Sequence, residues 1–180
     1  MKYIPFPLVC FMFFNVLNSQ EIEKTSGFFY KPSLATTIGV NEDYEVFDES
    51  TGTLFVPNSV FVNNTLGYQF DRRSLLGFNV EYNWHASNNL QFLPLHLSFQ
   101  YNIIANDDNV FLRGSYGRFL PVNRHFEEGT FYRVGTGVQL FDANYKNSWH
   151  LGLDFTRKRF GFRQTEKLSS VSLFLEFMLF

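Results

Sequence analysis

Beyond residue 30 the chain alternates apolar and polar residues with a period of two, and groups of turn-forming residues interrupt this alternation at regular intervals. Successive side chains of a β-strand point to opposite faces, so the pattern predicts strands with one apolar face and one polar face. We predict eight strands, over residues 33–40, 59–70, 75–85, 91–103, 110–119, 130–141, 148–158 and 168–180.

The predicted connections are of two kinds. Residues 71–74, 105–109 and 142–147 form short polar turns. The connections that alternate with these turns include two distinctly longer ones, and the first covers residues 41–58. Short turns at one end and longer loops at the other are typical of outer-membrane barrels. With both chain ends on the short-turn side, an even strand count follows.

The apolar face carries too much volume for the inside of a small barrel. In the strand 91–103 it consists of Leu93, Leu95, Leu97, Phe99 and Tyr101. An eight-stranded barrel has an interior just wide enough for side chains to fill, so large residues from every strand would overfill it. The polar face includes Gly39, Gly67, Gly77, Gly117, Gly135, Gly137 and Gly152. Glycine makes room in a crowded lumen.

We therefore expect the apolar face to point outward, toward hydrocarbon, and the polar face to fill a narrow lumen. Closure of the barrel pairs the backbone groups of every strand, as the interior of a bilayer requires. The fold class is then an all-β, closed, up-and-down antiparallel transmembrane β-barrel of about eight strands. The alternative is a soluble exported barrel with an apolar interior that binds a small apolar ligand.

Residues 1–20 have the three parts of a secretory signal peptide. Lys2 precedes an apolar stretch over residues 4–17, and a small polar segment follows it. We predict that residues 1–20 are removed and that residues 21–180 form the barrel domain. Cys10 is the only cysteine, so neither a disulfide nor a cysteine-based zinc site can form within one chain.

Length and charge narrow the function classes. The 180 residues fit one domain. The formal net charge of −2 gives no general attraction for nucleic acid. No segment after the signal peptide is apolar enough over about 18 residues to form a membrane helix. We find no glycine loop for phosphate, no spacing of metal ligands and no pair of catalytic carboxylates, so we expect no cofactor.

The chain resembles the small OmpA/OmpX-type outer-membrane barrels, particularly the short barrel proteins of Bacteroidetes-type bacteria. The resemblance rests on the signal peptide, the strand rhythm and the final strand VSLFLEFMLF, which ends in Phe180. It implies that the barrel-assembly machinery reads the terminal aromatic residue during biogenesis. Phe180 departs from the pattern, because it shares a face with Glu176 and not with Leu179. Either the register shifts near the end or the signal is imperfect.

Seven chemically active residues sort with the polar face: Glu81, His96, Arg113, Arg133, His150, Asp154 and Glu176. An unpaired charge in a lumen of low dielectric costs several kcal/mol, so we expect these charges to pair across the barrel. The resemblance implies a salt-bridged plug. The alternative is a polar channel or proton path, although an open pore does not fit eight strands.

His96 and Ser98 suggest one catalytic alternative. They lie two residues apart on one strand face, as in a serine-hydrolase triad. Outer-membrane lipid A deacylases use a comparable His-x-Ser pair on a barrel of this size. Those enzymes place an Asn and a small residue after the serine, whereas Phe99 and Gln100 follow here. Their active groups also face lipid, whereas this pair sorts with the lumen.

Basic residues gather near the last outer loop and at the same end of neighbouring strands: Arg118, Arg124, Arg157, Lys158, Arg159, Arg163 and Lys167. Guanidinium groups bind phosphate through two parallel hydrogen bonds, and lipopolysaccharide carries phosphates at the outer surface. We therefore predict a rim that contacts lipopolysaccharide and outer-membrane lipid. The alternative is a set of solvated charges, or pairing with the acidic residues of the first outer loop.

The sequence as a whole favours a non-enzymatic integral outer-membrane barrel with a structural or surface-interaction role. Its lumen is predicted to be plugged and its outer rim basic. The alternatives are a lipid hydrolase that uses Ser98 and His96, a soluble exported ligand-binding barrel, and a narrow porin-like channel. The sequence identifies no specific ligand and no oligomeric state.

Overall fold

The computed structural model describes residues 26–40, 55–85, 90–105, 108–122, 126–142, 147–161 and 164–180. The predicted signal peptide, the acidic first loop, Arg124 and Arg163 lie outside the described residues. The elements within these ranges are β-strands. No helix in this part of the chain is long and apolar enough to cross a membrane.

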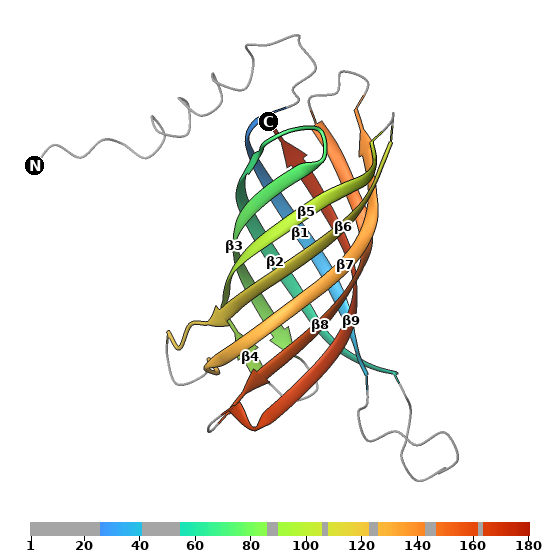
Figure 1. Ribbon diagram of the computed structural model, residues 1–180. Helices are drawn as coiled ribbons and strands as arrows, with labels where there is room; N and C mark the ends of the chain where they lie inside the picture. Colours follow the sequence, from blue (N-terminus) through green and yellow to red (C-terminus); the bar gives the residue numbers. More distant parts are fainter. Residues whose placement is uncertain are drawn as a thin grey trace, which may run out of the picture.

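The strands form one closed antiparallel sheet (Figure 1). They are β1 (Gly27–Val40), β2 (Phe55–Gln69), β3 (Ser74–His85), β4 (Leu90–Phe92), β5 (Pro94–Ala105), β6 (Asn109–Phe119), β7 (Gly129–Phe141), β8 (Asn147–Phe160) and β9 (Glu166–Leu179). Each strand from β5 to β8 pairs with the one that follows it, β1 pairs with β2 and β9, and β2 pairs with β3. The pairing of β1 with β9 closes the barrel.

β4 and β5 act as one strand of the barrel. β4 pairs Asn83 of β3 with Phe92, and β5 continues in the same register by pairing Val80 with Leu95. The interruption falls at Leu93, directly before Pro94, and proline has no backbone N–H to donate to a ladder. The closed sheet of the described residues therefore has eight strands, as the sequence predicts.

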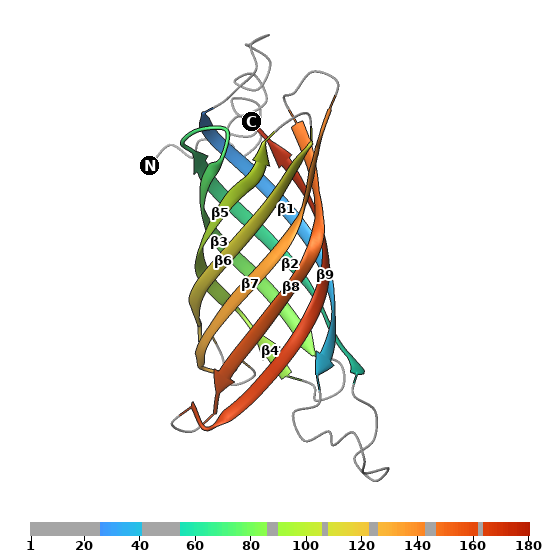
Figure 2. The same ribbon diagram turned by 45° about the vertical axis from the view of Figure 1, so that its right-hand side comes forward.

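The two ends of the barrel differ, and we name them by their connections. The turn end carries the short connections after β2, β5 and β7, together with the start of β1 and the end of β9. The loop end carries the connections after β1, β3, β6 and β8. The strands run obliquely between the two ends (Figures 1 and 2). The short polar turns fall at one end as predicted, and the two distinctly longer connections, after β1 and β6, both belong to the other end.

The turn between β2 and β3 shows how the sequence fixes a connection. The Oδ1 atom of Asp71 accepts the backbone N–H groups of Arg73 and Ser74, each at 2.7 Å. Asp favours turns because its short side chain bonds the backbone two or three residues on. These hydrogen bonds to the backbone of Arg73 and Ser74 hold the pKa of the Asp71 carboxyl below its usual value.

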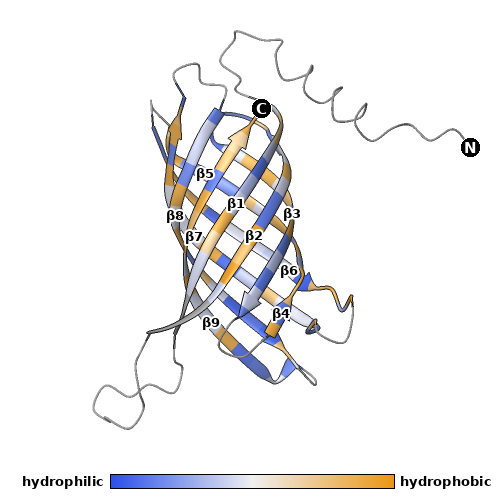
Figure 3. Cartoon of the chain, turned by 180° about the vertical axis from the view of Figure 1, so that it is seen from behind, coloured by the Kyte–Doolittle hydropathy of each residue, from blue (hydrophilic) through white to orange (hydrophobic). Residues whose placement is uncertain are grey.

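The assignment of the two faces is confirmed. Phe155 and Leu175 are outside, with 39% and 45% of their surface exposed. Arg133 and Glu81 are inside, with 4% and 0% exposed. Hydrophobic and hydrophilic residues alternate along the strands (Figure 3). A soluble barrel with an apolar interior requires the reverse arrangement.

The strands start earlier than the alternation suggests, and the register shifts in two strand pairs, in β1–β2 between Thr37 and Ile38 and in β5–β6 near the end of β5. β1 begins at Gly27, six residues before its predicted start, and β2 begins at Phe55. The register between β5 and β6 shifts between Asn102 and Ile104. Ile103 and Ile104 consequently both lie on the outer surface, each 48% exposed. An inserted residue produces this result because it interrupts the alternation of faces.

The interior also holds apolar side chains, in three clusters. The cluster at the loop end consists of Phe92, Phe119, Phe131 and Phe160. The cluster at the turn end consists of Phe29, Leu75 and Met178, with Phe180 packed against it. The third consists of Ala35, Phe61, Phe111 and Phe174. We expected a lumen of glycine and polar residues alone, so these clusters correct that expectation.

Phe180 belongs to the interior side of the turn end. Its ring packs edge-on against that of Phe29, with the centroids 6.4 Å apart. The β8–β9 register runs without a shift from Glu166 to Leu179. The register shift considered for the last residues therefore does not occur, and Phe180 remains on the face of Glu176.

Candidate functional site

The interior charges form a connected network, and Arg113 is at its centre. Arg113 Nε donates to Asp154 Oδ1 at 2.8 Å, and a second guanidinium nitrogen bonds Asp154 Oδ2. Arg113 Nη1 donates to Glu176 Oε1 at 2.6 Å. Lys31 Nζ lies 2.7 Å from Glu176 Oε2. The Arg113 guanidinium also lies 3.6 Å from the centre of the Phe174 ring, in the geometry of a cation–π contact.

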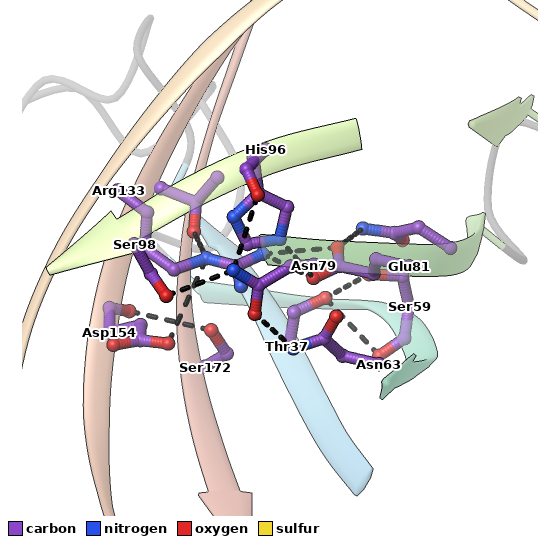
Figure 4. Close-up of polar contacts among 12 residues, drawn as sticks. Thr37, Ser59, Asn63, Asn79, Glu81, His96, Ser98, Arg133, Asp154 and Ser172 are labelled. Atoms are coloured by element: carbon purple, nitrogen blue, oxygen red, sulfur yellow. Dashed lines mark hydrogen bonds and ion pairs between the residues drawn. The ribbon is translucent and has the colours of Figure 1, made fainter. Parts of the chain in front are cut away.

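Arg133 forms the second part of the network (Figure 4). Its Nη2 atom lies 3.0 and 2.9 Å from the two carboxylate oxygens of Glu81. Its Nε atom donates to Thr156 Oγ1 at 3.0 Å and lies 3.8 Å from Asp154 Oδ2. Asp154 therefore connects the two arginine groups on the inner face of β6, β7 and β8.

The interior histidines lie beside this network. His150 Nε2 is 3.2 Å from the Ser148 hydroxyl, and its ring packs against Phe111. His96 Nε2 is 3.8 Å from Glu81 Oε2, which exceeds hydrogen-bond distance. Thus the structure places all seven residues of the predicted lumen set inside the barrel.

Lys158 belongs to the lumen and not to the rim. Only 1% of its surface is exposed. Its Nζ atom lies 2.8 Å from His85 Nε2 and 4.7 Å from the centre of the Phe92 ring. The prediction that Lys158 contacts lipopolysaccharide is therefore wrong. Its neighbours Arg157 and Arg159 face outward, since adjacent residues of a strand point to opposite faces.

Sequence reasoning missed two members of the interior set. Lys31 was missed because the first strand was predicted to begin at residue 33, although Lys31 has the same parity as Ser33. His85 has the parity of Glu81 and Asn83. The alternation contained the signal for both residues.

The charges inside the described part of the barrel almost balance. Three carboxylates, those of Glu81, Asp154 and Glu176, face four bases, Lys31, Arg113, Arg133 and Lys158. Removing one partner of a buried ion pair costs about 3–5 kcal/mol, because the other charge is left without compensation. The network therefore constrains strands β1, β3, β6, β7, β8 and β9 relative to one another.

The His96–Ser98 pair does not have the geometry of a nucleophile and its base. The Ser98 hydroxyl accepts a hydrogen bond from Asn79 Nδ2 at 2.9 Å and donates to Gly77 O at 3.4 Å. Among the described residues neither ring nitrogen of His96 has a hydrogen-bond partner. Both side chains face the lumen (Figure 4), whereas lipid would meet the outer wall.

Part of the predicted rim forms a row across the outer wall at the loop end. Arg118 pairs with Thr130, and Thr130 pairs with Arg159. Arg159 in turn pairs with Lys167. Neighbouring strands are about 4.8 Å apart, so the row places three exposed basic side chains of β6, β8 and β9 within about 15 Å.

A second row lies two residues nearer the middle of the barrel. Tyr116 pairs with Tyr132, and Tyr132 pairs with Arg157. Both tyrosines are exposed, and Arg157 Nη1 donates to Ser169 Oγ at 3.4 Å. We name Arg118, Arg157, Arg159 and Lys167 the basic rim. Aromatic residues below basic ones match the belt found where a membrane meets water.

No group of three or more histidine, cysteine, aspartate or glutamate residues in the described ranges is arranged to hold a metal ion.

The fold is that of the small OmpA/OmpX-type barrels. The structure is similar to the crystal structure of Neisserial surface protein A (NspA), with a TM-score of 0.63 and 12% sequence identity over 87% of this chain and 99% of that chain. This similarity confirms the fold that the sequence resemblance implied. The N-terminal β-barrel domain of Pseudomonas aeruginosa OprF matches with a TM-score of 0.47 and 9% identity, over 84% and 97% of the two chains. No protein-family model and no curated protein matches the chain.

Proposed function

We propose that this protein is an integral outer-membrane barrel with a plugged lumen and a non-enzymatic role in the envelope or at its surface. The observation that carries the proposal is the inverted distribution of its side chains. A belt of large apolar residues surrounds the barrel, and buried ion pairs lie in the middle of its interior. In water the apolar belt would be exposed over the whole outer wall, which is unfavourable. A bilayer removes this free-energy cost because the belt then contacts hydrocarbon.

The plugged lumen follows from two kinds of filling. The charge network connects strands across the middle, and apolar clusters occupy the lumen at the loop end and at the turn end. An ion crossing the barrel has to displace aromatic rings and break buried ion pairs. We therefore expect no steady unitary conductance in planar-bilayer recordings.

The basic rim is proposed to bind the phosphates of lipopolysaccharide. Outer-membrane barrels have their longer loops on the extracellular side. In this orientation the loop end lies at the outer leaflet, where the basic rim and the tyrosine row contact the lipid headgroups. Replacing Arg118 and Arg159 together by glutamine should weaken lipopolysaccharide binding about tenfold, the loss expected for about 1.4 kcal/mol of charged hydrogen bonding. The matched control, glutamine at Arg72 and Arg73 of the turn end, should leave this binding unchanged.

Fractionation tests the location, and heating tests the closed barrel. We expect the protein in the outer-membrane fraction, and we expect it to migrate differently on a detergent gel before and after boiling. Recovery in a soluble fraction without detergent would contradict the proposal. Incubation with lipid A should release no fatty acid. Release that the Ser98→Ala variant abolishes would instead support the hydrolase.

A further inference from the structure

A small cavity lies within the lumen beside His96. It is lined on one side by Phe29 and Leu75 of the turn-end cluster and on the other by polar side chains that include Ser98 and Ser115. It leaves about 20 Å³ of space for the centres of water molecules. A water molecule needs a cavity of about 10–15 Å³ when the volume that the water itself occupies is counted, so a space this large for water centres has room for at least one.

Buried polar atoms with unmet hydrogen-bonding capacity surround this space. His96 is 3% exposed, and neither of its ring nitrogens has a hydrogen-bond partner among the described residues. The same is true of Asn63 Oδ1 and Gln100 Oε1, both on residues that line the cavity. A buried polar atom without a partner loses the hydrogen bonds that it makes to water in the unfolded chain, so three such side chains around one cavity indicate an occupant.

The neighbouring hydrogen bonds determine which amide atoms of Asn63 and Gln100 are left without a partner. Asn63 Nδ2 donates to Asn79 Oδ1 at 3.1 Å, and Gln100 Nε2 donates to Asn102 Oδ1 at 3.1 Å. Asn102 Nδ2 in turn donates to a backbone carbonyl, that of Arg72, at 2.9 Å. Since these amide nitrogens already donate, the amide atoms without a partner on the lining residues Asn63 and Gln100 are acceptors. The occupant must therefore be a hydrogen-bond donor.

This requirement separates the possible occupants. Chloride accepts hydrogen bonds but donates none, so it satisfies neither amide oxygen. A metal cation would lie among Lys31, Arg113 and Arg133, which also line the cavity, and their positive charges would repel it. The one carboxylate of the lining, that of Glu176, is already paired with Lys31 and Arg113. Water is neutral, donates to two oxygens and accepts from a third group, which matches two amide oxygens and one imidazole.

We propose that this cavity is an internal hydration site in which ordered water bridges His96, Asn63 and Gln100. The water lies between the apolar clusters at the two ends, so its exchange with bulk solvent is slow. The site completes the polar filling of the middle of the lumen, and it does not depend on which membrane or compartment holds the barrel.

Substitutions of Ser115 test the proposal, because a hydrated and a dry cavity predict opposite changes in stability. Ser115 lines the cavity, and none of the hydrogen bonds found among the described side chains depends on it. Ser115→Val adds methyl groups that displace the water, whereas the control Ser115→Ala adds no volume. We expect the urea midpoint of the valine variant to fall about 1 M below that of the alanine variant, because polar atoms lose their partner. A valine midpoint at or above that of alanine would mean a dry cavity and would overturn the proposal.

A second measurement uses the unaltered barrel in case the valine variant does not fold. Wild-type protein with ¹⁵N-labelled histidine, refolded in micelles, should show magnetisation transfer from long-lived water to the His96 ring. The His96→Gln variant identifies the resonance by its loss. If the His96 ring shows no transfer from water, the hydration site is wrong, whether or not the barrel is confirmed in the outer membrane.

Discussion

Arg113 and Asp154 form an ion pair over the inner face of β7, the strand that separates their own strands. The residue of β7 between them is Gly135, which pairs with Arg113 on one side and with Asp154 on the other. A Cβ atom at Gly135 would collide with Asp154 Oδ1 and would lie 2.7 Å from the Leu153 carbonyl oxygen. The absence of a side chain there is what lets Arg113 Nε reach Asp154 at 2.8 Å.

Gly135→Ala should therefore destabilise the barrel. The added methyl group pushes the Asp154 carboxylate away from Arg113, and overpacking of this kind costs about 1–3 kcal/mol. Urea unfolding of protein inserted in lipid vesicles measures the change. Gly114→Ala is the matched control, since a Cβ atom there meets nothing within 4 Å, and its free energy of unfolding should change by less than about 0.5 kcal/mol. Equal effects of the two substitutions would contradict this role of Gly135.

Val138→Arg tests the outer face of β7. Val138 lies on the outer wall between Val110 and Leu151 of the neighbouring strands. An arginine that faces hydrocarbon near the bilayer midplane costs about 2–4 kcal/mol, and less toward the interfaces. The same unfolding titration should show a loss in this range. Val122→Arg, beyond the end of β6, should cost much less, and a harmless Val138→Arg would mean that this face does not meet lipid.

The contact between His85 and Lys158 implies that the stability of the barrel depends on pH. A hydrogen bond between His85 Nε2 and Lys158 Nζ at 2.8 Å requires a lone pair on one nitrogen, so the folded pair cannot carry two positive charges. The unfolded chain protonates both residues once the pH falls below about 6.5. The unfolded state then binds more protons, and stability falls as the pH decreases from about 7 to 5, by up to about 1.4 kcal/mol per pH unit.

His85→Gln separates this pair from the other histidines. Glutamine can accept the hydrogen bond from Lys158 through its amide oxygen but does not titrate. The variant should lose part of the acid sensitivity between pH 7 and 5, while the part due to buried His96 and His150 remains. An unchanged slope in unfolding titrations at several pH values would show that the His85–Lys158 pair contributes nothing.

The sequence predicts the barrel well because every strand has one face toward the lumen and one toward the outside, and these two environments require different side chains. Outward residues such as Leu97 and Leu173 and inward residues such as Asn79 and Ser172 follow the period of two without exception over long stretches. The eight strands, the two kinds of connection and the direction of each face follow from this pattern. The start of β1 does not, because Phe28 and Phe29 put aromatic side chains on both faces.

The contents of the lumen were only partly predictable. The parity of Phe131 with Arg133, and of Phe174 with Ser172, indicates interior aromatic residues, but a polar lumen was expected. Lys158 was assigned to the rim because its neighbours are arginines, although its parity with Thr156 indicates the interior. The contact between Arg113 and Asp154 depends on the inclination and register of three strands, which no local pattern contains.

The most direct test of the inverted arrangement uses the two tryptophans of the chain. Trp84, near the loop end of β3, and Trp149, near the turn end of β8, are 45% and 48% exposed on the outer wall. In vesicles of phospholipids with brominated acyl chains, the emission of both single-tryptophan variants, Trp84→Phe and Trp149→Phe, should be strongly quenched, and aqueous iodide should have little effect. Quenching by iodide without quenching by the brominated chains would contradict an apolar outer wall that faces lipid.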